Sequence, residues 1–222
     1  MNHPAPTVRP VRQRRKETRP QELLDAALDL FVEKGFAATR SEEVAQRAGV
    51  SKGTLYLYYP SKEELFKAVV RQNLSNLINE GLEKVAAFDG TTSELLVMLL
   101  NIWWERVGQS KAGGIHKIVV AEVRNFPELA QFYADEVMAP AEQLFTRTLQ
   151  RGVERGEFRD VPTREVAHAL MAPIIFLLLH QHSFGCCPVS ALRVDPRATL
   201  DAHIDLVLHG LEVRRLPNQA GQ

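Results

Sequence analysis

Residues 39–65 of the 222-residue chain read TRSEEVAQRAGVSKGTLYLYYPSKEEL, and this stretch decides the fold. Its first part predicts a short helix that begins at Thr39, whose hydroxyl can cap the helix while Glu42 closes a T-x-x-E capping box. That helix is expected to stop at Gly49, and the next helix begins at Ser51. Two short helices joined by such a tight, glycine-containing turn form a helix-turn-helix.

The second helix of this pair has a polar start. Lys52, Gly53 and Thr54 follow Ser51 directly, and a helix that only served a core would not need them in succession. A glycine inside a helix costs about 1 kcal/mol relative to alanine, so Gly53 indicates that another molecule must approach the backbone closely. Many helix pairs have a glycine in the turn, but this composition favours a DNA-binding helix.

Helical periodicity continues on both sides of the pair. One apolar face predicts an amphipathic helix over residues 19–34, with Pro20 in its first turn and Gly35 at its end. A second capping box, Ser61 to Glu64, opens a helix that reaches about Val85. Further helices are expected over residues 93–107, 116–124, 127–152 with an interruption at Pro140, 163–183 with a bend at Pro173, and 196–213. No alternating strand pattern is seen, and the predicted fold class is all-α.

The charge is distributed unevenly. The whole chain has 27 basic and 27 acidic residues, but residues 1–71 carry 13 basic and 9 acidic side chains, a surplus of four. Much of this surplus lies near the N-terminus, in Arg9, Arg12, Arg14, Arg15, Lys16 and Arg19. A basic end on an otherwise neutral chain predicts a polyanionic partner for that end alone.

The two cysteines, Cys186 and Cys187, are adjacent in the sequence. Neighbouring Cα atoms lie about 3.8 Å apart, below the usual disulfide range of roughly 4.4–6.8 Å, so we expect two free thiols in a reducing compartment. The basic N-terminus lacks the apolar run of a secretory signal. The longest apolar run, residues 169–179, is shorter than the about 20 residues of a membrane span, which predicts a cytoplasmic protein.

Residues 19–65 resemble the TetR family of bacterial transcriptional regulators. The resemblance is carried by Leu23-Leu24-Asp25-Ala26-Ala27 to Phe31, Gly35-Phe36, Thr39, Val44-Ala45, Ala48-Gly49-Val50, Ser51-Lys52-Gly53-Thr54-Leu55-Tyr56, Tyr59 and Ser61-Lys62-Glu63-Glu64-Leu65. Three positions depart from the usual pattern: Arg40 replaces a small hydroxyl residue, Tyr58 a histidine and Tyr59 a phenylalanine.

The resemblance implies that the helix from Ser51 lies in the DNA major groove. Lys52 is then a reader of guanine, Thr54 a contact to a base edge or a thymine methyl, and Gly53 the point of closest approach. The expected phosphate contacts are Ser51, Thr39, Arg40, Tyr56, Tyr58 and Lys62. Arg12, Arg14, Arg15 and Lys16 either follow the DNA backbone, enter the minor groove or form a solvated tail.

The expected organisation is a flexible basic arm over residues 1–18, a helix-turn-helix DNA-binding domain over 19–65, a helical ligand-binding and dimerisation domain over 66–215, and a disordered tail over 216–222. One short helix makes too few base contacts, so a homodimer on an inverted repeat is predicted. By analogy with the family, the helices over 163–183 and 196–213 form the dimer interface.

A small-molecule effector is expected in the C-terminal domain. The candidate lining residues are Trp103, Trp104, Phe126, Phe132, Tyr133, Met138, Phe145, Phe176 and His180. Because adjacent helical side chains point about 100° apart, at most one of the two tryptophans can face a central cavity. The few polar groups nearby, His116, Glu122, Arg106 and His180, favour a neutral or hydrophobic ligand.

Three alternatives stay open. His180, His182, Cys186 and Cys187 could bind a metal or sense redox state, but their spacing matches no zinc pattern, and no metal or cofactor is predicted. No catalytic motif supports an enzyme. A ligand-independent regulator or an activator, whose C-terminal domain only dimerises, competes with a ligand-released repressor, the family's commoner type.

Overall fold

The computed structural model describes residues 11–185 and 193–213, with side chains from Arg19 onward. All the secondary-structure elements of this part of the chain are helical, as predicted, and its only extended pairing is an isolated bridge between Phe158 and Glu212. The chain divides into two compact units, the first ending at Val69 and the second beginning at Val70. The predictions for residues 1–10, for Cys186 and Cys187 and for the C-terminal tail lie outside the described residues.

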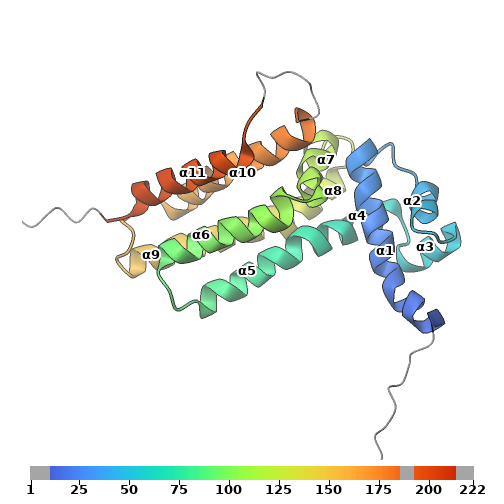
Figure 1. Cartoon of the computed structure of the whole chain (residues 1–222), viewed down its shortest axis with the longest axis horizontal. Coiled ribbons are helices and arrows are strands. Elements are labelled where there is room, and N and C mark those ends of the chain that lie inside the picture. Colours follow the sequence, from blue (N-terminus) through green and yellow to red (C-terminus); the bar gives the residue numbers. More distant parts are fainter. Residues whose placement is uncertain (1–10, 186–192, 214–222) are drawn as a thin grey trace, which may run out of the picture. The chain divides into compact units, whose positions relative to one another are not determined.

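The N-terminal unit contains α1 (Val11–Lys34), α2 (Ser41–Arg47), α3 (Lys52–Tyr58) and most of α4 (Lys62–Val70) (Figure 1). Three buried rings form its centre: those of Phe31, Phe36 and Phe66 lie 5.3–5.6 Å apart, centre to centre. Gly35 follows the end of α1 with a φ angle of 84°, and Gly49 lies in the turn after α2 with a φ angle of 66°. Those angles favour glycine because it has no Cβ.

Helix α1 begins earlier than predicted, at Val11 instead of Arg19. The expectation of a flexible arm is therefore wrong for residues 11–18. This segment is rich in Arg, Gln, Lys and Glu, which have high helix propensity, and it joins a helix that is already anchored on the core. Pro20 lies inside the helix and not in its first turn.

The start of α2 is also shifted from the prediction. Thr39 does not cap the helix: its hydroxyl is turned inward and donates to the carbonyl oxygens of Gly35 (2.7 Å) and Leu30 (3.1 Å). The N-cap position is Arg40, whose backbone N–H donates to the carboxylate of Glu43 at 3.3 Å. The carboxylate that closes the helix start is therefore that of Glu43 and not that of Glu42.

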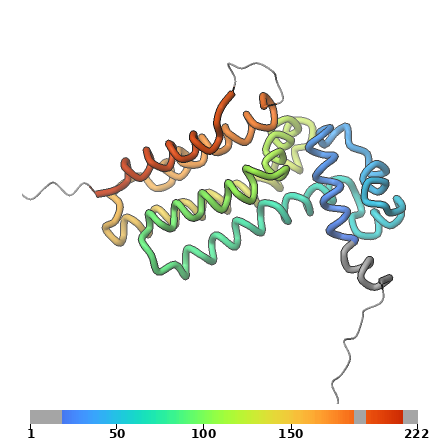
Figure 2. The backbone as a smooth tube through the Cα atoms, in the orientation of Figure 1, coloured from blue at the N-terminus to red at the C-terminus, as the bar shows by residue number. Residues whose placement is uncertain are grey.

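The C-terminal unit is a helical bundle (Figures 1 and 2). Its α-helices are α5 (Asn76–Ala87), α6 (Thr92–Trp103), α7 (Gly114–Glu122), α8 (Pro127–Tyr133), α9 (Ala139–Glu154), α10 (Thr163–Ser183) and α11 (Pro196–Leu211). Helix α9 packs against α5, α6 and α10, and α10 also packs against α7 and α11. Shorter elements are the π turns η1 (Arg71–Ser75), η2 (Trp104–Gly108) and η4 (Ala134–Met138) and the 3-10 turn η3 (Lys111–Gly113).

Sequence signals explain several helix starts in this unit. Thr91 and Glu94 form a capping box at the start of α6, and the Asp195 side chain caps α11. The predicted interruption of the 127–152 helix is present, but the π turn η4 makes it, while Pro140 sits in the first turn of α9, where a missing N–H costs little. Helix α10 continues through Pro173.

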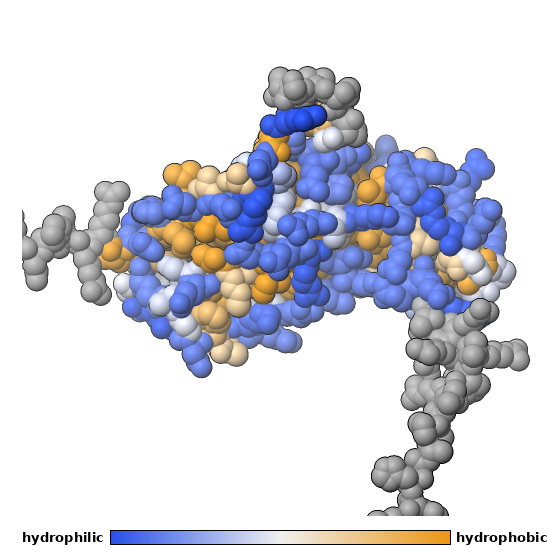
Figure 3. Space-filling model, in the orientation of Figure 1, coloured by the Kyte–Doolittle hydropathy of each residue, from blue (hydrophilic) through white to orange (hydrophobic). Residues whose placement is uncertain are grey.

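By length and composition alone, α10 would be able to cross a membrane. In the structure it packs against α7, α9 and α11, yet only 28% of its most apolar 18-residue window is buried. In Figure 3, apolar side chains interrupt the otherwise polar surface of the C-terminal unit along α11. Helices α10 and α11 therefore leave apolar side chains uncovered in the single chain.

Candidate DNA-binding helix and ligand cavity

The start of α3 is held by a hydroxyl cap and presents its backbone to solvent. The Ser51 side chain accepts from the Thr54 N–H at 3.1 Å, and the two hydroxyls lie 2.9 Å apart. Leu55 is fully buried and anchors the helix on the domain. A Cβ placed on Gly53 would meet only the Ser51 hydroxyl, at 3.8 Å. Internal packing therefore does not require a glycine at this position.

Lys52 lies at the surface between α2 and α3. Its ammonium forms an ion pair with Glu42 and lies 5.7 Å from the centre of the Tyr56 ring. Hydrogen bonding in this pair raises the pKa of Lys52 and lowers that of Glu42. Both side chains are more than half exposed, so the lysine can exchange the carboxylate for another partner.

Four of the predicted contact residues besides Lys52 and Gly53 lie at the surface of this region: Arg40, Ser51 and Tyr56 are exposed, and Thr54 is half-buried. Tyr58 is half-buried as well. The sequence reading missed Leu57, which is 80% exposed on the same helix. Its apolar side chain gives no signal of exposure in the sequence, and only the rotation of α3 places it outward.

Two predicted phosphate contacts are engaged inside the domain. Thr39 is 1% exposed and its hydroxyl already has the two carbonyl acceptors described above, so it cannot reach a phosphate in this structure. The Lys62 ammonium donates to the carbonyl oxygens of Phe36 (2.9 Å), Ala37 (3.2 Å) and Thr39 (3.2 Å). These three carbonyls follow the end of α1, and Lys62 closes that turn.

The C-terminal unit contains a cavity of about 600 Å³. It is lined by α5, α6, α7, α8, α9, α10 and the π turn η4, and most of its lining side chains are apolar. Trp103, Tyr133, Met138 and Phe145 were predicted as lining residues and do line it. Trp103 faces the cavity and Trp104 does not, in agreement with the angular argument for adjacent residues.

The other five candidates do not line this cavity. Trp104 is buried in the core and its ring covers Gly108, where a Cβ would lie 2.3 Å from ring carbon Cε3. Phe132 lies under the guanidinium of Arg71 at 4.9 Å, and Phe126 is the N-cap of α8. Phe176 and His180 lie on α10 with ring centres 5.8 Å apart, and Phe176 is exposed.

His116 is the polar group deepest in the cavity lining. It is 4% exposed, and its Nδ1 atom is buried without a hydrogen-bond partner. The rings of Trp103 and Tyr133 lie 6.1 and 6.0 Å away, both nearly perpendicular to the imidazole. Burial lowers the pKa of His116 to about 4, so the imidazole is neutral at neutral pH. From the sequence, His116 was predicted only to be one of the few polar groups near the candidate lining residues.

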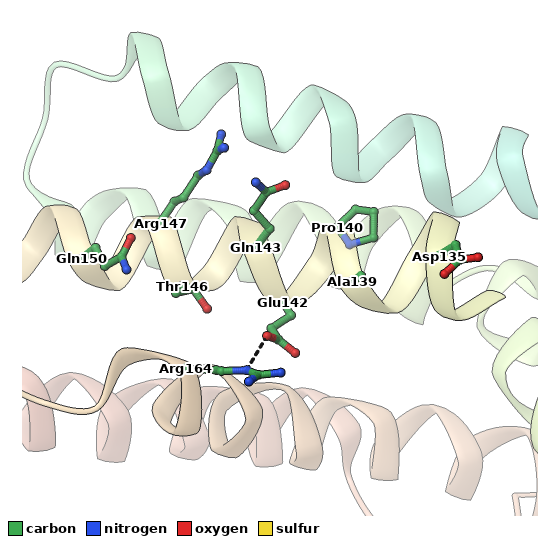
Figure 4. Close-up of a pocket in the computed structure, with 9 residues that line it drawn as sticks. All are labelled: Asp135, Ala139, Pro140, Glu142, Gln143, Thr146, Arg147, Gln150 and Arg164. Carbon is green, nitrogen blue, oxygen red and sulfur yellow. Dashed lines mark hydrogen bonds and ion pairs between the residues drawn. The ribbon is translucent and has the colours of Figure 1, made fainter. Parts of the chain in front are cut away.

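Two carboxylates that line the cavity, those of Glu80 and Glu142, are paired with basic side chains, and the lysine Lys84 lines the cavity as well. Glu80 accepts from Arg106 at 2.6 Å. Glu142 accepts from Arg164 at 2.7 Å and contacts His168 at 2.8 Å, and both interactions lower the pKa of its carboxyl group. Glu142 also lines a second, polar groove of about 520 Å³, where Arg164 reaches it from α10 (Figure 4).

The predicted His/Cys cluster is described only in part. In the described ranges 11–185 and 193–213, no group of three or more His, Cys, Asp or Glu side chains is placed to hold a metal ion. The His180 ring lies 5.8 Å from the Phe176 ring and 5.9 Å from the Phe184 ring, centre to centre, while His182 lies against Gly113. The two cysteines belong to the segment that the structure does not describe.

A helix-turn-helix unit followed by a helical unit with an internal cavity defines a class of DNA-binding regulators with an effector domain. Residues 23–69 match the family model for bacterial regulatory proteins of the tetR family. Residues 89–184 match the model for a tetracyclin repressor-like C-terminal domain. The chain therefore belongs to the TetR family of transcriptional regulators.

Relatives with known names agree with this assignment. The repressor KstR2 of Rhodococcus jostii is 29% identical over 198 residues, which are 88% of this chain and 92% of KstR2. The regulator RutR of Escherichia coli is 49% identical over 63 residues, 28% of this chain and 30% of RutR. The crystal structure of the regulator FadR of Bacillus subtilis, in complex with stearoyl-CoA, superposes with a TM-score of 0.67 at 19% identity. That match covers 86% of this chain and 98% of FadR.

Proposed function

We propose that this TetR-family regulator is a cytoplasmic repressor that binds an inverted-repeat operator as a homodimer and leaves it when an apolar molecule enters the cavity. The observation that carries the proposal is the apolar cavity of about 600 Å³ in a chain that also has a helix-turn-helix unit. This volume lies within the roughly 300–1,000 Å³ of small-molecule sites. The names of KstR2, a repressor, and of FadR, solved with stearoyl-CoA, support repression and ligand binding.

In the DNA-bound state, α3 enters the major groove with its N-terminus foremost. Lys52 exchanges Glu42 for a guanine edge, and Thr54 contacts the neighbouring base. Gly53 lets the DNA come close, because no internal contact fills the space where its Cβ would be. Arg40, Ser51, Tyr56 and Tyr58 hold phosphates, whereas Thr39 and Lys62 support the domain from within.

The homodimer forms through α10 and α11. These helices are neighbours, and Phe176 on α10 and Leu206 on α11 are 54% and 72% exposed in the single chain. Large apolar side chains at such exposure are covered when two copies pack their paired helices as a four-helix bundle. The dimer then presents two copies of α3 to two half-sites.

The test begins with footprinting of the purified protein on DNA that flanks its own gene, followed by selection from random sequence. A protected inverted repeat is expected, and it becomes the probe for ligand release. Lys52→Ala should relax the selected preference at one base pair in each half-site, while Gln46→Ala, a change at an exposed position of α2, serves as the matched control. A folded dimer that selects no sequence in either experiment would rule the proposal out.

The alternative is a regulator whose C-terminal unit only dimerises. This alternative predicts that filling the cavity has no effect on the affinity of the protein for operator DNA. Gly81 lines the cavity, and a Cβ there would lie 2.9 Å from a methyl group of Leu144, so Gly81→Val intrudes on the cavity. Ligand-released repression predicts that apolar molecules free the operator from the wild type and lose this effect in Gly81→Val.

A further inference from the structure

The exposed apolar side chains of the N-terminal unit are concentrated on α3. Among residues 19–69, whose side chains the structure describes, the exposed large hydrophobic residues are Tyr56 and Leu57, both on this helix. Tyr56 has a hydroxyl group and lies beside the ammonium of Lys52, whereas Leu57 has no polar group in its side chain. At 80%, Leu57 is also the most exposed large hydrophobic residue in the described part of the chain.

Leu57 lies on the side of α3 that faces away from the domain. Leu55 is fully buried, and Leu57 follows it by two residues, which is about 200° around the helix. Gly53 precedes Leu55 by two residues and therefore shares the outward line with Leu57, one turn earlier. Because Gly53 has no side chain, Leu57 supplies the only side chain on this line of α3.

We infer that Leu57 packs against the C5 methyl group of a thymine in each half-site and thereby sets a preference for thymine at that position. The inference rests on the proposed function, in which α3 enters the major groove. A leucine side chain has no donor or acceptor, so it cannot read the hydrogen-bonding groups of the bases. The thymine methyl is the apolar group that the major groove presents, and packing the two together removes both from water.

The same chemistry makes other bases unfavourable next to Leu57. Guanine and adenine present acceptors in the major groove, and cytosine and adenine present amino groups. A leucine pressed against such a group removes its water and offers no hydrogen bond in return. Leu57 therefore adds specificity of a kind that the ammonium of Lys52 does not supply.

Thr54 is the competing candidate for a thymine contact, since its side chain also carries a methyl group. It is half-buried, and its hydroxyl lies 2.9 Å from that of Ser51, within the cap of α3. Thr54 follows Gly53 directly and so lies to one side of the outward line that Gly53 and Leu57 share. The exposed position of Leu57 favours it over Thr54 as the residue that meets a methyl group.

The experiment uses the full-length protein and the operator obtained by footprinting and selection. Each thymine of the half-site is replaced in turn by deoxyuridine, which lacks only the methyl group, at the symmetric positions of both half-sites. At one position the affinity of the wild type should fall by about fourfold for each half-site, the value of one buried methyl group. Removing thymine methyls would have no effect if Leu57 contacted only deoxyribose, another protein or solvent.

Two variants assign the sensitive position to a residue. Leu57→Ala should bind the thymine and deoxyuridine forms of that position equally well, so the two losses are not additive. Its melting temperature should match that of the wild type, because the leucine is exposed. Thr54→Ser is the matched control: it removes a methyl group and keeps the hydroxyl, and it should remain as sensitive to deoxyuridine at that position as the wild type.

Three results overturn the inference and leave operator binding in place. They are a half-site without thymine, a wild type that is indifferent to deoxyuridine at every position, and a Leu57→Ala variant that is as sensitive as the wild type at every position. If the folded dimer selects no operator, the proposed function fails, and the inference fails with it.

Discussion

The ammonium of Lys62 lies 4.5 Å from the centre of the Phe36 ring and donates a hydrogen bond to the carbonyl oxygen of the same residue at 2.9 Å. The Phe36 ring packs in the aromatic centre of the N-terminal unit, against Phe31 and Phe66. Lys62 thus joins the start of α4 to the turn that ends α1. The sequence predicted a phosphate contact for Lys62, but in the structure this side chain contacts Phe36.

Replacing Lys62 with alanine should therefore lower stability and not the electrostatic part of DNA binding. Three carbonyl oxygens lose their charged donor, which we expect to reduce the free energy of unfolding by about 1–3 kcal/mol. Thermal and denaturant unfolding measure this loss. Lys52→Ala is the control, because its ion pair is exposed and its removal should leave stability almost unchanged. An unaltered melting temperature for Lys62→Ala would contradict the capping role.

Lys52 and Arg40 should affect DNA binding in different ways. Lys52→Ala should relax the preference at one base pair in each half-site, because a base contact is lost. Arg40→Ala should weaken binding to all sequences and reduce the slope of log affinity against log salt by about one unit. Binding selections and salt titrations on the operator separate the two effects. Uniform weakening by both variants would mean that neither residue reads a base.

The sequence predicts the helix-turn-helix closely but not the direction of every side chain. Residues 39–43 contain overlapping patterns, since a capping box fits from Thr39 to Glu42 and the structure uses Arg40 and Glu43. A shift of one residue turns Thr39 inward and changes it from a phosphate contact to a buried support. No propensity rule distinguishes the two registers, because tertiary contacts to Leu30 and Gly35 decide between them.

The side chains that line the cavity were harder still to predict from the sequence. The sequence indicated nine candidate lining residues, most of them aromatic, and four of the nine line the cavity. Trp103 and Tyr133 each stand directly before a π turn, which shifts the helical register of the residues that follow. A periodicity of 3.6 residues cannot anticipate such a shift. The burial of His116 in the cavity lining likewise becomes visible only when the surrounding helices are in place.

Disrupting the exposed apolar residues of α10 and α11 should convert the dimer to a 25.0 kDa monomer. Phe176→Asp or Leu206→Asp places an unpaired charge in the proposed apolar interface, where it would lose its hydration. Dimerisation and operator binding should therefore be lost together. Sedimentation equilibrium measures the mass. Leu57→Asp is the matched control, because Leu57 is also an exposed apolar residue but lies on α3. A monomeric Leu57→Asp variant, or a dimeric Phe176→Asp and Leu206→Asp double variant, would move the interface elsewhere.

The burial of His116 should make stability depend on pH between about 4 and 6.5. Burial depresses the folded-state pKa from 6.5 to about 4, so in this window the unfolded chain binds a proton that the folded chain does not. The free energy of unfolding should therefore fall as pH decreases, by up to about 1.4 kcal/mol per unit and about 3 kcal/mol in all, and it should not change on this account above the window. His182, whose pKa is also lowered, adds a loss in the same direction. Subtracting the unfolding curve of His116→Phe from that of the wild type isolates the part that belongs to His116. Parallel curves would show that this imidazole is protonated as readily in the folded chain as in the unfolded one, and a buried, neutral His116 would then be wrong.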